Sequence, residues 1–106
     1  MLAIKNVTVS MKPYKKNRFH LHPKGEDFTL DVAETDGFYQ LLKDENSDRW
    51  FLAEMDGKVV MLSEFEVSAE NKPLWLTMIV LPSEDLVNLE THMIPMASDL
   101  VERYFG

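Results

Sequence analysis

Two histidines and a group of cations near the start of the chain are the residues best suited to ligand chemistry. His20 and His22 lie within residues 12–25, KPYKKNRFHLHPKG, which hold five of the eleven basic residues and no acid. On a strand, residues i and i+2 point the same way, so both imidazoles could reach one metal ion. The neighbouring cations repel a divalent ion, and no third ligand is spaced nearby. The sequence therefore predicts no metal and no other cofactor. The candidate ligands are His20 and His22, which would need a third from elsewhere, such as His92 or a carboxylate.

The same basic segment is also a candidate site for phosphate-bearing ligands. Its cations alternate with aromatic rings, and they are Lys12, Lys15, Lys16, Arg18 and Lys24. Cations meet phosphates while rings stack on bases, and an anionic lipid head group offers similar chemistry. The net charge of −7 and the pI of about 4.8 argue against nucleic acid. The plainer alternative is a basic strand that protects a sheet edge from aggregation.

The acidic remainder of the chain favours a protein partner of opposite charge. Residues 1–24 contain six basic residues and no acid, whereas residues 25–106 contain five basic and eighteen acidic residues. Complementary charge speeds encounter and sets specificity. Toxin-neutralising immunity proteins and nucleic-acid mimics use acidic surfaces in this way. We therefore expect a small interaction protein, for which an immunity- or inhibitor-like role is one form.

No arrangement of residues predicts catalysis. The chain has no cysteine, and no nucleophile-elbow sequence surrounds any of its serines. Its four glycines form no phosphate-binding loop. The sequence also has no secretory signal pattern, and its longest apolar run, residues 74–81, is far too short to cross a bilayer. We expect a cytoplasmic protein without enzymatic activity or a membrane span.

These residues are expected to be positioned by a run of strands followed by one helix. Asp-Gly pairs at 36–37 and 56–57 predict tight hairpin turns. The second turn would place Ala53 opposite Val60 and Arg49 opposite Glu64. Six or seven strands follow from the apolar alternation, at residues 2–10, 18–22 (the optional one), 27–34, 38–43, 49–55, 58–67 and 74–81.

Residues 83–105 predict one helix, capped by Ser83 and kinked at Pro95. An apolar stripe runs along it through Leu86, Leu89, Met93, Ala97, Leu100 and Tyr104. The expected fold is α+β in a single domain, residues 1–106. An antiparallel meander over 1–81, curved or barrel-like, carries the helix on one face. This order of elements is similar to that of pleckstrin-homology-like barrels, a likeness that implies no function.

The hairpin 49–67 is apolar on both faces, and a single helix covers only one of them. Trp50, Leu52, Val59, Met61, Phe65 and Val67 make the natural core face. The other face carries a candidate interaction patch, consisting of Phe51, Ala53, Met55, Val60 and Leu62 with Glu64 and Glu66 at its end. Residues 74–81 are likewise apolar on both faces. We expect the patch to be covered by the rest of the chain, to pair with a second copy, or to receive a different protein.

Overall fold

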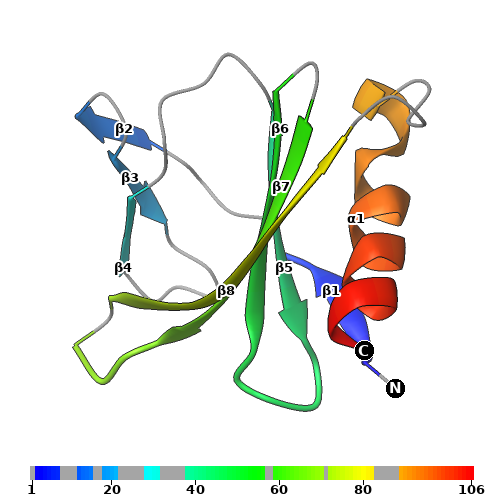
Figure 1. The fold of residues 1–106 in the computed structure, drawn as a ribbon. Coiled ribbons are helices and arrows are strands. Elements are labelled where there is room, and N and C mark those ends of the chain that lie inside the picture. Colours follow the sequence, from blue (N-terminus) through cyan, green and yellow to red (C-terminus); the bar gives the residue numbers. More distant parts are fainter. Residues whose placement is uncertain are drawn as a thin grey trace.

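The chain has an α+β fold with an open five-stranded antiparallel sheet, a separate three-stranded antiparallel sheet and one C-terminal helix (Figure 1). The computed structural model describes residues 2–7, 12–15, 18–21, 28–31, 38–56, 59–70, 72–82 and 89–106. It describes side chains in 2–7, 39–55, 59–70, 72–82 and 94–106.

The five-stranded sheet is the main body of the fold. Its strands are β1 (Ile4–Asn6), β5 (Phe38–Asp44), β6 (Trp50–Asp56), β7 (Val59–Val67) and β8 (Pro73–Pro82). They lie in the order β1-β5-β6-β7-β8, so the last four form the expected meander. The expectation of six or seven strands in one barrel-like sheet is wrong, because this sheet has five strands and stays open.

The three strands that follow β1 in the chain form a sheet of their own. They are β2 (Lys12–Lys15), β3 (Arg18–Leu21) and β4 (Phe28–Asp31), in the order β2-β3-β4. The expected hairpin between residues 27–34 and 38–43 is wrong, because β4 pairs with β3 whereas β5 pairs with β1. The Asp-Gly pair predicted to turn that hairpin lies outside the described residues. Figure 1 shows this small sheet on the side of the main sheet that faces away from the helix.

Strands β6 and β7 pair with a register that differs by two residues from the predicted one. Asp56 is opposite Val59, and Ala53 is opposite Leu62 rather than Val60. A shift of two residues leaves every side chain on its predicted face, because the side-chain period of a strand is two. Arg49 and Glu64 still form the expected ion pair, with 3.1 Å between Nε and Oε1. Glu64 reaches it diagonally, since its direct partner is Phe51.

The helix α1 (Leu89–Phe105) is continuous through Pro95, as the unbroken phase of its apolar stripe predicts. The first part of the expected helix, residues 83–88, lies outside the described residues. Ala97, Leu100, Val101 and Phe105 pack on the sheet. Tyr104, which the predicted stripe included, is instead exposed. Among the described residues, no helix has the length and apolar content that crossing a membrane requires.

Both faces of the central strands are covered. On the helix face, α1 packs against a cluster formed by Leu42, Phe51, Ala53, Met55, Val60 and Leu62. On the opposite face lies a second cluster, formed by Val7, Leu41, Trp50, Leu52 and Phe65. Val7 follows β1, so part of this cover comes from the N-terminal segment. The helix thus packs on the face that the sequence had suggested as the patch.

Candidate functional site

The predicted interaction patch lies beneath the chain's own helix. Its five apolar members, Phe51, Ala53, Met55, Val60 and Leu62, are all buried there. The two faces of the hairpin are almost equally apolar, so residue pattern alone could not assign the helix to one of them. The small side chains of Ala53 and Ala97 allow a close approach of helix and sheet. In this structure the patch therefore belongs to the core, and the chain's own helix α1 covers it.

The two acids at the end of the patch differ, because Glu64 forms an ion pair and Glu66 is exposed. Arg49 donates from Nε to Glu64 Oε1 at 3.1 Å and from Nη2 to Oε2 at 3.3 Å. The same Nη2 donates to the carbonyl oxygen of Phe105 at 3.1 Å. This guanidinium therefore ties β7 to the last turn of α1, where cations also complement the helix dipole. Glu66 remains exposed at the surface.

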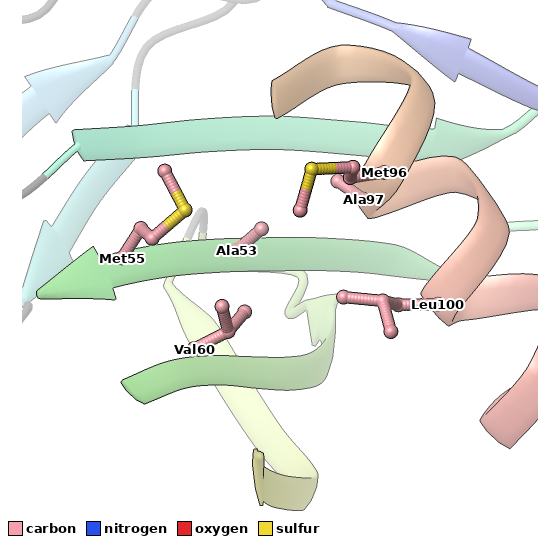
Figure 2. A pocket seen from close by; sticks show the side chains of 6 residues that line it. All are labelled: Ala53, Met55, Val60, Met96, Ala97 and Leu100. Carbon is pink, nitrogen blue, oxygen red and sulfur yellow. The ribbon is translucent and has the colours of Figure 1, made fainter. Parts of the chain in front are cut away.

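The contact between helix and sheet leaves only a very small cavity. Figure 2 shows the six residues around it, which are Ala53, Met55, Val60, Met96, Ala97 and Leu100. The cavity has a volume of about 10 Å³, which is at the lower limit of what a single water molecule needs. Its lining is almost entirely apolar side chain, so it offers neither room nor polar partners to a ligand.

Strand β8 carries the exposed apolar side chains of the sheet. We call Leu74, Trp75, Leu76, Met78 and Val80 the β8 surface. All five are at least 44% exposed, and Met78 reaches 62%. The strand has no charged residue between Pro73 and Pro82. It forms one edge of the main sheet, with β7 on its inner side. A contiguous apolar group of this kind on a folded chain usually marks an interaction site.

An irregularity in the pairing of β7 and β8 brings Trp75 to the face of Met78 and Val80, whereas Leu74, opposite Glu66, lies on the helix side. Glu64 is opposite Thr77, yet the next residue, Phe65, is opposite Trp75, so Leu76 is an extra residue in β8. Such a bulge re-aims side chains locally. It brings Trp75 to the face of Phe65, where the two rings pack with centroids 5.0 Å apart. Met78 and Val80 are opposite Ser63 and Met61, and so share that face.

A hollow of about 360 Å³ opens beside the bulge, and a buried carboxylate lies in its wall. Glu54, Met61 and Ser63 contribute to it from β6 and β7, and Trp75, Leu76, Thr77 and Met78 from β8. Glu54 is only 6% exposed. Its Oε2 has no hydrogen-bond partner in the described part of the chain. Burial raises the pKa of the Glu54 carboxyl above its usual value, because removal from water disfavours the charged form.

A second buried carboxylate, Asp44, has a structural role in the turn after β5. Its Oδ2 accepts the Ser47 hydroxyl at 2.7 Å, and its Oδ1 accepts the Asn46 amide at 3.1 Å. The Ala3 amide also donates to Oδ1, at 3.4 Å, which ties the N-terminal segment to this turn. The hydrogen bond from Ser47, together with that from Asn46, holds the pKa of Asp44 below its usual value. These contacts account fully for Asp44 without a ligand.

The basic segment lies on the small sheet, where only the backbone is described. Pairing of β2 with β3 sets Lys12 opposite His20 and Lys15 opposite Arg18. Arg18 is also opposite Asp31 of β4. Strand β3 lies in the middle of this sheet, so β2 is the basic strand at its edge. Lys16, His22 and Lys24 lie outside the described residues. Within the described part of the chain, no three histidine or acidic side chains lie close enough together to hold a metal ion.

Residues 74–81 were predicted to be apolar on both faces, but their exposure in the structure was not predicted. Glu54 was missed altogether. The available signal was that Glu54 is the one acid inside the apolar run from Trp50 to Met55. An acid in that position, with apolar neighbours on its own strand, is either exposed to solvent on an edge strand or buried in a central strand of the sheet. Only the order of strands decides between these outcomes.

Comparisons of the chain with models of protein families, with curated proteins and with solved structures find no match.

Proposed function

We propose that this chain is a non-enzymatic interaction protein that binds a cationic protein on the face of the sheet opposite the helix, over β8. The observation that carries the proposal is the β8 surface, an exposed apolar group on an uncharged edge strand, of which Trp75, Met78 and Val80 lie on this face. Binding there would remove apolar area from water, and each fully buried side chain of this size contributes about 1.5–3 kcal/mol. An immunity- or inhibitor-like role falls within this class.

Charge supports a partner other than a second copy. Each chain carries −7, so two copies repel one another, whereas a cationic protein is attracted and correctly oriented. Charged side chains lie near the start of β8, where Glu66 and Glu70 are exposed together with Lys72. A rim of charge around an apolar centre is the usual composition of a protein interface.

The ends of β8 support docking on its face rather than pairing with its edge. Pro73 and Pro82 close the strand at its two ends, and the extra residue Leu76 interrupts its regular pleat. Prolines and bulges are features by which proteins discourage the addition of another strand. A partner that packs side chains onto Met78 and Val80 needs no regular hydrogen-bond ladder.

The test compares two lysine substitutions of similar exposure in different places. Val80→Lys puts a charge on the β8 surface, and Ile94→Lys puts the same charge on the exposed side of α1. Tagged wild-type chain captures proteins from an extract of its host. Each captured protein is then purified and titrated against the three chains by calorimetry. We expect one-to-one binding of a protein with net positive charge, at least about tenfold weaker with Val80→Lys and unchanged with Ile94→Lys.

Two results would overturn this assignment. Equal weakening by both substitutions would mean that charge alone matters and that β8 is not the contact. Alternatively, sedimentation could show a wild-type dimer that Val80→Lys dissociates, in which case a second copy occupies the surface. Circular dichroism of both variants checks that the fold survives.

A second candidate function is the binding of phosphate-bearing ligands by the small sheet. The specific observation is the β2–β3 pairing, which collects Lys12, Lys15 and Arg18 on adjacent strands. Neutralising all three should abolish any binding of single-stranded nucleic acid or anionic vesicles at low salt, and leave Val80-dependent binding intact. Undetectable binding by the wild-type chain under these conditions would eliminate this candidate.

A further inference from the structure

Glu54 has no partner among the described side chains that explains its burial. Its direct neighbours across the sheet are Tyr39 on β5 and Met61 on β7. No described side chain forms a salt bridge with it, and Oε2 accepts no hydrogen bond from the described residues. A buried polar group without a partner costs stability, and a buried charge costs more. An acid retained under that cost, in the wall of an open hollow, suggests a partner that arrives from outside.

We propose that this hollow binds the side chain of a lysine or arginine of the partner protein, with Glu54 as its counter-charge. The inference rests on the proposed function, because it names the group by which the cationic partner would be held. The cation would enter between the apolar walls of Met61, Leu76 and Met78, and its charged end would meet the carboxylate. The hollow, at about 360 Å³, has room for such a side chain.

The walls suit a cation that has an apolar stem. Methionine and leucine side chains contact the methylene groups that lysine and arginine carry below their charge. Trp75 adds the face or edge of an indole, the best aromatic partner for a cation. Its ring is held in place by Phe65, so it needs no reorganisation on binding. Ser63 is buried in the same wall and supplies a hydroxyl that can accept a hydrogen bond from an ammonium or guanidinium group.

Small probes test this site on the complete chain, without the partner. The n-butylammonium ion reproduces a lysine side chain, n-propylguanidinium reproduces an arginine side chain, and n-pentanol is a neutral molecule of similar length. Each is titrated at neutral pH into protein labelled with ¹³C at the methionine methyl groups, and NMR follows the methyl shifts. Met61 and Met78 line the hollow and report binding. Met55 and Met96 lie at the helix–sheet cavity and serve as internal controls.

We expect both cations to move the Met61 and Met78 signals in a saturable way and to leave Met55 and Met96 unchanged. Whichever cation binds more tightly identifies lysine or arginine as the natural occupant. Pentanol should bind at least about tenfold more weakly, and Glu54→Gln should weaken the cations by a similar factor, since a hydrogen bond to a charged group is lost. Trp75→Leu should weaken them several-fold.

Two outcomes would overturn the inference. Pentanol binding as tightly as the cations would show an apolar slot in which the acid has no part, and this comparison needs only wild-type protein. An absence of saturable shifts at Met61 and Met78 would show that no cation enters. In either case the β8 surface could still bind a partner through Val80, so the proposed function stands or falls on its own experiment.

Discussion

Truncating Leu62 and Met78 in turn tests which apolar residues of this sheet form its core. Leu62 is completely buried under α1, whereas Met78, on the neighbouring strand β8, is 62% exposed. Both are large apolar residues near the middle of neighbouring strands, and sequence pattern alone does not separate them. If the helix covers the face that carries Leu62, Leu62→Ala removes buried methyl groups and leaves a cavity. Met78→Ala removes groups that water already surrounds.

The expected magnitudes differ clearly. A fully buried Leu→Ala substitution costs 2–5 kcal/mol, and about 3 kcal/mol is reasonable beside the small Ala97, since the helix can settle only partly. Met78→Ala should stay within about 0.5 kcal/mol. Because domains of this size are stable by about 5–15 kcal/mol, the Leu62 variant should remain folded and measurable. With a urea m-value of about 1.5 kcal/mol/M, its midpoint should fall by about 2 M.

Urea unfolding followed by both circular dichroism and tryptophan fluorescence measures these shifts. Coincident transitions from the two probes would justify a two-state treatment. A loss below about 1 kcal/mol for Leu62→Ala would refute the placement of the helix over this face. A loss for Met78→Ala equal to that for Leu62→Ala would refute the exposure of β8, and with it the surface on which the proposed function rests.

Substitutions at three further positions test contacts near the ends of the fold. Arg49→Ala should lower the free energy of unfolding by about 2 kcal/mol, because Glu64 and the carbonyl of Phe105 lose a charged donor. Arg49→Lys should recover part of this loss in urea unfolding. Full recovery would argue against simultaneous contact of the guanidinium with Glu64 and Phe105. Asp44→Asn should destabilise the chain at neutral pH but not in acid. The pKa of Asp44 is lowered in the fold, so its contribution is complete above the usual value of 3.8 and disappears as pH falls through the folded value; a difference that persists at pH 2 would contradict this. Pro95→Ala should raise the melting temperature by a few degrees, since it restores a helical backbone donor at an exposed position; a fall would mean that the proline shapes the contact with the sheet.

The parts of the fold that were predictable are those that local chemistry determines. Alternating apolar residues and the Asp56–Gly57 pair were enough to define β6 and β7 as a hairpin. The spacing of Ala97 and Leu100 defined the helix across Pro95. The register was missed by two residues because more than one pairing satisfies both the turn and the alternation. That error changed no face assignment, since it preserved the parity of the strand.

The unpredicted parts depend on contacts between distant segments. Strand β1 pairs with β5, and Asp44 fixes that junction through the Ala3 amide, forty-one residues away in the chain. Nothing local to residues 2–7 indicates this neighbour, whereas the adjacent β4 was a plausible and incorrect choice. The sheet face on which the helix packs could not be predicted for a related reason. Trp50 and Phe51 are consecutive residues of similar size that point to opposite faces, and each is buried in its own cluster.

The same two-faced apolar pattern gives a core in β6 and β7 and a surface in β8. The difference lies in their order within the sheet, which only the complete fold defines. Strand β7 has a neighbour on each side, and its residues reach both clusters, Leu62 beneath the helix and Phe65 on the other side. Strand β8 has β7 on one side and lies beyond the main contacts of both clusters, so Met78 and Val80 remain in water. Several large apolar side chains exposed to solvent lower the solubility of the protein and favour aggregation. A protein packed over β8 would extend the opposite-face cluster outward from Phe65 and Trp75. It would also bring its own cation to Glu54, the one buried carboxylate with an unpaired oxygen among the described residues.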